Sequence, residues 1–325
     1  MKIQSILYLI PVFCLFSACN NKGTTDTTDT PVQSYQKVSP DFDADSAYTY
    51  IQKQTDFGPR VPNTNAHIEC GDYLVSELKR FEAEVIEQKT ELTTFDGTKL
   101  NARNIIGSYN TDKKQRILLF AHWDSRPFAD KDPNEENLSE PVLGVNDGAS
   151  GVGVLLETAR IIQHNLLDVG VDIIFFDAED YGSYSDSESW CLGSQYWARN
   201  PHVPNYTAKY GILLDMVGAK DAKFYKEDYS VFYAAAIVEK TWGIARKLGY
   251  GTFFIDKRGG AITDDHVPVN EIRRIPSINI IHTTADGNFF EHWHTTNDDM
   301  NNISRETLKA VGQTILEVIY TEKGE

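Results

Sequence analysis

Apolar residues recur along the chain with two periods, and together these periods predict an alternation of helices and strands. Residues 151–164 carry apolar side chains that recur three, four, seven and ten positions apart, which is the spacing of one helix face. Residues 171–176 form an almost continuous apolar run, which is typical of a strand covered on both faces. Similar patterns predict further helices at 43–55, 66–81, 230–248 and 304–321, and strands at 84–92, 103–109, 116–121, 212–214 and 278–281.

This alternation predicts a single α/β domain over residues 43–325, with three layers and a central mixed, mainly parallel sheet. The chain has 325 residues, of which 41% are hydrophobic and 24% are charged. Such a composition excludes a mostly disordered chain and a chain with many membrane spans. The net charge of −16 repels phosphate backbones, so we expect no nucleic acid partner.

The N-terminal segment has the composition of an export signal followed by a tether. A basic residue precedes an apolar run at 3–16 that is too short to span a bilayer, and small residues then lead to Cys19. We therefore predict a signal peptide at 1–18 and a lipidated Cys19 that anchors the exported protein in the bacterial cell envelope, facing the periplasm or the cell surface. A plain signal peptide cut nearby is the alternative. Polar residues 19–42 are predicted to form a flexible tether.

Two cysteines, Cys70 and Cys191, remain in the body after removal of the signal. Export permits a disulfide between them. Two buried free thiols are the alternative, and the sequence does not decide between the two states.

Acidic residues and histidines follow four of the predicted strands at the point where each strand ends. These polar groups lie at 122–124, 177–180, 215 and 282–294, and a fifth group at 146–151 leads into a predicted helix. A lone Asp before a helix is more simply explained as an N-cap. Because ligands bind beyond the carboxyl ends of parallel strands, however, five such groups together predict one site. Clustered carboxylates require a cation to offset their repulsion, and a set of Asp and His suits zinc.

The pair Glu179-Asp180 suggests a division of roles. Neighbouring residues in an extended segment point to opposite sides, so one carboxylate can bind a metal while the other faces the substrate as a general acid/base. A solvated acidic turn is the simpler alternative.

The succession of these segments resembles the zinc aminopeptidase clan (peptidase family M28) and its branch of animal-type glutaminyl cyclases. The resemblance extends from about residue 45 to about residue 320. It is carried by Phe57-Gly58-Pro59-Arg60, His122-Trp123-Asp124, Asn146 to Gly151, Glu179-Asp180, Leu214 to Gly218 and Trp293-His294-Thr295. Two further segments favour the cyclase branch: Thr263 to Pro268, and Phe289 with Trp293-His294.

The resemblance implies a role for each matching residue. It implies a zinc aminopeptidase-like fold and one zinc ion, with Asp147, Asp180 and His294 as ligands. Glu179 would be the general acid/base, and Asp215 and Asp264 would form a hydrogen-bonded acidic pair beside it. Trp293 and Phe289 would wall the substrate pocket.

The chain departs from the family pattern at several positions. Asp180 stands where many members carry Glu, which leaves an oxygen ligand on a shorter arm. Thr263 replaces a Gln of the animal cyclases, which puts one substrate contact in doubt. A Trp that follows the acidic pair in those enzymes has no clear counterpart, and either Tyr184 or Trp190 could replace it. We expect the long acidic loop at 126–145 to be solvated; a pocket rim and a second-metal site are the alternatives.

The implied activity is conversion of an N-terminal glutamine into pyroglutamate with release of ammonia, on peptide or protein substrates. The rival within the same family is a di-zinc aminopeptidase, in which His122 and Asp215 hold a second zinc and Asp147 bridges the two ions. A rival of another class is a catalytically inactive, lipid-tethered binding protein. The presence of Glu179 argues against this last possibility, because such a protein needs no proton shuttle.

Overall fold

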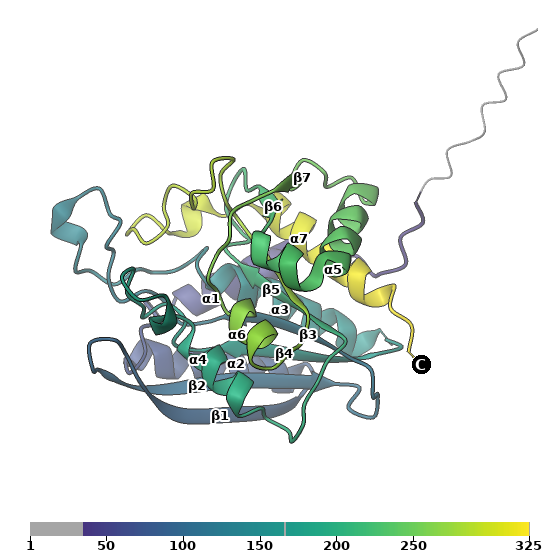
Figure 1. Ribbon diagram of the computed structural model, residues 1–325, viewed down its shortest axis with the longest axis horizontal. Helices are drawn as coiled ribbons and strands as arrows, with labels where there is room; N and C mark the ends of the chain where they lie inside the picture. The colour runs from purple at the N-terminus through teal and green to yellow at the C-terminus, as the bar shows by residue number, and fades with distance from the viewer. Residues whose placement is uncertain (1–34, 166, 325) are drawn as a thin grey trace, which may run out of the picture. The chain divides into compact units, whose positions relative to one another are not determined.

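Six strands form the central sheet of the computed structural model, which describes residues 35–165 and 167–324 (Figure 1). The strand order is β1–β2–β4–β3–β5–β8, and β6 and β7 form a separate two-stranded sheet. The strands of the central sheet are β1 (Glu84–Thr93), β2 (Lys99–Tyr109), β3 (Arg116–His122), β4 (Gly170–Phe176), β5 (Tyr210–Asp215) and β8 (Ser277–Ile281). The small sheet contains β6 (Phe224–Lys226) and β7 (Phe254–Arg258).

Helices cover both faces of the central sheet, as Figure 1 shows with α4 and α6 in front of it and α1, α2 and α3 behind. The helices are α1 (Ala44–Thr55), α2 (Asn65–Arg80), α3 (Ala149–His164), α4 (Leu192–Arg199), α5 (Asp228–Lys247), α6 (His266–Glu271) and α7 (Arg305–Tyr320). Short 3₁₀ turns occur at Glu135–Asn137, Ser187–Ser189 and Met300–Asn302. The α/β fold of three layers is therefore confirmed.

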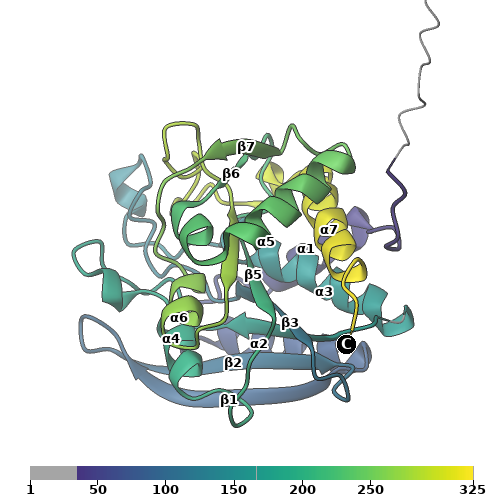
Figure 2. The same ribbon diagram turned by 45° about the vertical axis from the view of Figure 1, so that its right-hand side comes forward.

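The strand directions agree with the prediction of a mixed, mainly parallel sheet. Strands β4, β3, β5 and β8 are parallel to one another, whereas β1 pairs with β2, and β2 with β4, in antiparallel register. Parallel neighbours share one carboxyl edge, so the loops that follow these four strands gather together. In Figure 2 the loops near residues 130, 185 and 290 lie on the same side of the molecule.

Side chains from alternate positions of β3 build two separate cores. Ile117 and Leu119 belong to the larger core, to which α1, α2, α3 and α7 contribute, whereas Leu118 and Phe120 pack with Trp197 of α4 in a smaller one. This alternation follows from the two-residue period of a strand. Because both faces of the sheet are covered, the sequences of β3 and β4 are almost continuously apolar.

Residues before the predicted boundary at residue 43 already pack onto the domain. Glu317 of α7 accepts hydrogen bonds from the backbone N–H groups of Val38 and Ser39, and Phe42 is buried against the same region. Residues 35–42, which we assigned to the tether, therefore lie against the domain. The predicted signal peptide and Cys19 lie outside the described residues.

Two further features bear on the sequence analysis. Cys70 and Cys191 are both buried free thiols, so the alternative without a disulfide holds. Among the described helices, none combines the length and the apolar character needed to cross a bilayer.

Candidate active site

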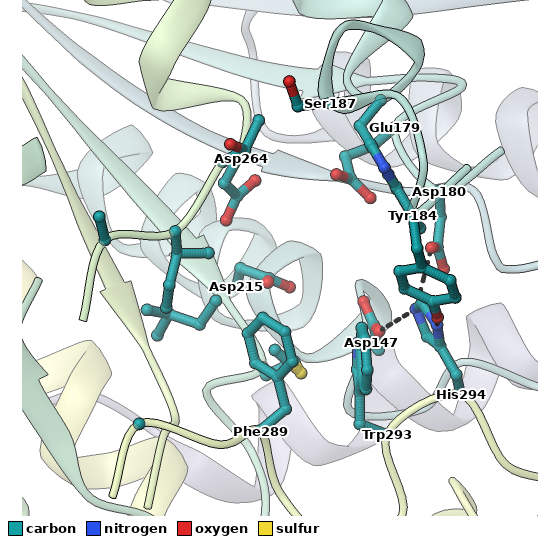
Figure 3. Close-up of a pocket in the computed structure, with 17 residues that line it drawn as sticks. Asp147, Glu179, Asp180, Tyr184, Ser187, Asp215, Asp264, Phe289, Trp293 and His294 are labelled. Carbon is teal, nitrogen blue, oxygen red and sulfur yellow. Dashed lines mark hydrogen bonds and ion pairs between the residues drawn. The ribbon is translucent and has the colours of Figure 1, made fainter. Parts of the chain in front are cut away.

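The carboxyl edge of the parallel strands holds a pocket of about 350 Å³ (Figure 3). Strand β5 contributes Asp215 at its last position, and β4 leads directly into the segment that carries Glu179 and Asp180. Asp147 precedes the first turn of α3, and His294 comes from the long loop after β8. The predicted site residues that line the pocket are Asp147, Glu179, Asp180, Asp215, Asp264, Phe289, Trp293 and His294. All eight predicted positions thus converge on one pocket.

Three of these residues can hold one metal ion. Asp147, Asp180 and His294 are buried, and one ligand atom from each lies within 4.8 Å of the others. His294 Nε2 is 3.0 Å from Asp180 Oδ1 and 3.6 Å from Asp147 Oδ2. Two carboxylates and one imidazole fit zinc, and a set of three protein ligands is typical of a catalytic zinc site with one open position.

Asp147 is fixed through its own backbone. The buried carboxylate of Asp298 accepts hydrogen bonds from the N–H groups of Asn146 (2.8 Å) and Asp147 (3.1 Å). The side-chain oxygen of Asn146 in turn accepts a hydrogen bond from the N–H of Gly218, just beyond β5. The loop before α3 is thereby tied both to the loop that carries His294 and to the end of β5.

The backbone of Glu179 and Asp180 is held by another carboxylate. Asp124 is fully buried and accepts hydrogen bonds from both N–H groups, each at 3.1 Å. Ala178, the preceding residue, has φ +53°, and its N–H donates to the carboxylate of Asp177. Asp177 also pairs with the buried ring of His67 at 2.9 Å. These contacts turn the chain sharply after β4, so that both acidic side chains reach the pocket.

His294 is oriented by contacts to its second ring nitrogen. Nδ1 lies 2.7 Å from the hydroxyl of Tyr184 and 3.5 Å from a carboxylate oxygen of Asp130. Arg126 pairs with Asp130 and donates to the carbonyl oxygens of Asp180 (2.8 Å) and Gly182 (3.0 Å). Partners of this kind fix the ring orientation and the tautomer of a metal-binding histidine.

The acidic loop is therefore only partly the solvated segment that we expected. Arg126 is buried, and the N–H of Lys131 donates to the carbonyl oxygen of His294 at 3.1 Å. Asp132 accepts hydrogen bonds from the N–H and the hydroxyl of Thr296. Residues 133–136 are exposed. The first part of the loop thus braces the site, and the tip is solvated.

A second potential metal set shares Asp147 with the first. His122 Nε2 lies 2.9 Å from Asp147 Oδ1 and 3.2 Å from Asp215 Oδ1. The three residues are buried and offer ligand atoms within 4.8 Å of one another. The donor atoms of both the one-zinc and the two-zinc arrangements are therefore in place.

The other three acids of the pocket, Glu179, Asp215 and Asp264, have raised pKa values. Burial, together with the charges of Asp180 and Asp264, raises the pKa of Glu179 well above its ordinary value. Burial likewise raises the pKa of Asp215 to about 6, and that of Asp264 to about 7. A Glu shifted in this direction holds a proton more readily than a free Glu, which suits a group that must accept and return one.

Asp215 and Asp264 approach the same pocket, but their hydrogen bonds differ from the expected mutual pair. Asp264 accepts from the side-chain amide of Asn279 at 2.6 Å and from the N–H of Asp265, whereas Asp215 contacts His122. No hydrogen bond joins the two carboxylates in the described structure. Each carboxylate instead contacts a neighbouring donor.

Aromatic rings close one side of the pocket, as Figure 3 shows for Phe289 and Trp293. The ring of Trp293 stacks on His294 with 3.9 Å between centroids, and Phe289 lies 4.3 Å from Trp293. Tyr184 and Trp190, between which the sequence analysis left a choice, both line the pocket. The hydroxyl of Tyr184 contacts His294, so its role extends beyond that of an aromatic wall.

Four buried or half-buried charged residues contact the site residues on the side away from the pocket, and the sequence assigned no role to them. They are Asp124, Arg126, Asp130 and Asp298. Only Asp124 had a visible signal, because it lies two residues after His122 at the end of a strand.

A parallel α/β sheet whose carboxyl edge gathers two carboxylates and an imidazole beside a pocket-facing Glu defines a metal-dependent enzyme. Residues 104–319 match Peptidase family M28. The chain therefore belongs to peptidase family M28, a family of zinc-dependent enzymes.

Solved structures and curated relatives agree with this assignment. The glutaminyl cyclase of Bacteroides thetaiotaomicron, solved with N-acetylhistamine, is 55% identical, with a TM-score of 0.87 over 88% of this chain and 100% of that one. A Zn-dependent exopeptidase from Parabacteroides distasonis is 59% identical, with a TM-score of 0.86 over 88% of this chain and 100% of that one. The glutaminyl-peptide cyclotransferase of Bos taurus is 26% identical over 296 residues, which cover 81% of this chain and 78% of the bovine protein.

Proposed function

We propose that the protein is a glutaminyl-peptide cyclotransferase, which converts the N-terminal glutamine of peptides or proteins into pyroglutamate and releases ammonia. One observation carries the proposal: Glu179 and Asp264 face each other within 4.8 Å, and both line an aromatic-walled pocket that also contains the ligand set Asp147, Asp180 and His294. Similarity to glutaminyl cyclases at 55% identity supports it.

In the proposed reaction the α-amine attacks the γ-amide carbon of the same residue. A C–N bond forms to the α-nitrogen, and the bond to the amide nitrogen breaks. Glu179 accepts a proton from the attacking amine and transfers it to the departing nitrogen, which leaves as ammonia. Zinc bound by Asp147, Asp180 and His294 would supply a Lewis acid for the γ-carbonyl oxygen.

The pocket residues prepare this reaction by holding the substrate in a compact form. Nucleophile and electrophile belong to one residue, so much of the rate gain comes from confining the side chain near its attack geometry. The rings of Trp293 and Phe289 can pack against this conformer and exclude water. Asp264, whose pKa burial raises to about 7, can hold or share a proton beside Glu179.

We propose one zinc ion per chain. In support, His122 can itself place a positive charge between Asp147 and Asp215. Burial alone would lower the pKa of His122, but its contacts with Asp124, Asp147 and Asp215 raise it well above the ordinary value. The second candidate, a di-zinc aminopeptidase, rests on the adjoining set of His122, Asp147 and Asp215 and on similarity to an exopeptidase.

Two parallel assays separate these functions. Purified protein with known zinc content is incubated with a dipeptide that begins with Gln and, separately, with a Leu-anilide. The proposal requires ammonia release from the first substrate with one zinc per chain. Release of aniline without ammonia, at two zinc ions per chain, would replace it with the aminopeptidase, and absence of both activities with saturating zinc would favour the binding protein.

The variant Glu179→Gln tests the proton shuttle. Glutamine has nearly the same shape but cannot carry the proton, so we expect kcat to fall by about 10² to 10⁴, the usual share of general acid–base catalysis. Zinc content should stay at the wild-type value, because Glu179 is outside the ligand set. Cyclisation at the wild-type rate would refute the assigned role.

We also propose that the protein is exported and anchored in the bacterial envelope through lipidated Cys19. The apolar run, the small residues before Cys19 and the polar segment after it support this. Exported proteins whose processing exposes an N-terminal Gln would then be candidate substrates. The wild type should partition with membranes and the variant Cys19→Ala should not; equal partition of the two would contradict the proposal.

A further inference from the structure

A buried thiol touches the proposed acid/base from behind. Sγ of Cys191 donates a hydrogen bond to Oε1 of Glu179 at 3.3 Å, and Cys191 is only 1% exposed. Within the described residues, this is the only hydrogen bond to the Glu179 carboxylate. Cys191 itself does not line the pocket, so the thiol contacts the side of the carboxylate that faces away from the substrate.

The position of this thiol is set by the backbone around it. The N–H of Cys191 donates to the carbonyl oxygen of Glu179, and the N–H of Leu192 to that of Ala178, both at 3.0 Å. Cys191 has φ +58°, a left-handed conformation that non-glycine residues rarely adopt. A Cβ on Gly193 would lie 2.0 Å from the carbonyl oxygen of Asp177, so only glycine permits this approach. The start of α4 is therefore locked against the segment that carries Glu179.

The surroundings of the thiol keep it a donor. Burial, with the charge of Glu179 added, raises the pKa of Cys191 well above its ordinary value, so the sulfur retains its proton. A ligand atom of Asp264 lies within 4.8 Å of both Sγ and the Glu179 carboxylate. The two acids and the thiol thus form a compact buried group beside the pocket.

We infer that Cys191 is a positioning residue of the cyclase: its thiol anchors one oxygen of Glu179 and leaves the other free to exchange protons with the substrate. This inference rests on the proposed function, because it assigns Cys191 to the group that would move the proton. Cys191 belongs neither to the proposed ligand set nor to the pocket lining, so the effect is on the orientation of Glu179 and not on metal binding or substrate affinity.

The matched variants Cys191→Ala and Cys191→Ser test the inference on zinc-loaded full-length protein. Alanine removes the donor, and we expect kcat for a Gln-initiated peptide to fall about fivefold, as loss of one ordinary hydrogen bond would produce. KM should stay within about twofold and zinc content should not change. Serine supplies a hydroxyl at the same position and should restore kcat to within about twofold of the wild type.

The other buried thiol provides the control. Cys70 of α2 is also fully buried, and no hydrogen bond from its thiol to an acid is found in the described structure. Cys70→Ala should lower the melting temperature about as much as Cys191→Ala but leave kcat unchanged.

Each outcome decides one question. A wild-type kcat in Cys191→Ala would refute the positioning role and leave the cyclase standing. Equal losses of kcat in the Ala and Ser variants would also refute it, since that pattern indicates packing alone. Absence of ammonia release by the wild-type protein would instead refute the proposed function.

Discussion

The carboxylate of Asp124 offers a sharp test of how the site is held, because it binds the backbone of both the proposed acid/base, Glu179, and the proposed metal ligand Asp180. Its two hydrogen bonds, to the N–H groups of Glu179 and Asp180, are both 3.1 Å long, and Asp124 itself is fully buried. The replacement Asp124→Asn keeps the shape of the side chain. It exchanges one acceptor oxygen for an NH₂ group, which can only donate.

The magnitude follows from this geometry. At most one of the two N–H groups can keep its partner, and the other then faces a donor at a buried position. A buried N–H without a partner costs about 1–3 kcal/mol, so we expect the free energy of unfolding to fall by about 2 kcal/mol. For a domain of this size that is a decrease in Tm of about 3 °C. Loss of a partner that orients metal ligands typically costs about 10–100-fold in metal affinity or activity.

Three measurements on the same preparation check the prediction: zinc affinity by competition with a chelator, kcat for a Gln-initiated peptide, and Tm by calorimetry. Asp112→Asn makes the same chemical change at an exposed position and serves as the control. If the Asp124→Asn protein bound zinc and cyclised the peptide as well as the Asp112→Asn protein, the hydrogen bonds of Asp124 would not be needed to position Glu179 and Asp180.

Three further predictions concern charge. Burial alone would lower the pKa of His294, but the carboxylates of Asp180 and Asp130 raise it to about 9. Zinc binds the neutral ring, so zinc binding to metal-free protein near pH 7.5 should release about one proton. Calorimetry in buffers of different ionisation enthalpy measures this release, and zinc binding without proton release would contradict the prediction. Burial alone would raise the pKa of Glu227, but contacts with His266 lower it to about 2. The ionised carboxylate therefore stabilises the folded state above pH 4.5, and this stabilisation is lost as the pH falls towards 2. Glu227→Gln in metal-free protein should accordingly lower the free energy of unfolding by up to about 3 kcal/mol at neutral pH and flatten its acid dependence in urea titrations, whereas parallel curves would contradict the assignment. Arg126→Lys replaces a planar guanidinium that contacts two carbonyl oxygens with a single ammonium. The variant protein should bind zinc about tenfold more weakly, and residues 183–188 should be cleaved faster by proteases. An unchanged rate of cleavage would contradict the proposal that Arg126 holds this segment.

The sequence predicted the site well where the chemistry follows from strand direction. Parallel strands share one carboxyl edge, so the acids after β4 and at the end of β5 had to meet there. The positions of Asp147 and His294 depend on loops, and the family resemblance rather than periodicity identified them. The structure brings these residues together as that resemblance implied.

The groups that hold the site could not be recognised in the same way. Asp298 resembles an ordinary turn residue in sequence, because its two backbone partners at 146 and 147 lie about 150 residues away. Arg126 lies in a segment whose acidic composition predicts solvation, although its own side chain is buried. Helices α4 and α6 escaped prediction because they have 8 and 6 residues, too few for a helical period to show.

The arrangement of these groups has a consequence for the metal-free protein. Each residue of the ligand set is held by a carboxylate that lies behind it. Asp298 accepts a hydrogen bond from the N–H of Asp147, and Asp124 accepts one from the N–H of Asp180. Asp130 contacts the ring of His294. These outer acids fix the ligands but add negative charge to a region that is already acidic. Without a metal, part of that charge must be offset by protons on buried groups, as the raised pKa values of Asp215 and Asp264 indicate. These carboxylates and the ligand set are therefore arranged to hold a cation, and binding of that cation should stabilise the folded chain as well as enable its chemistry.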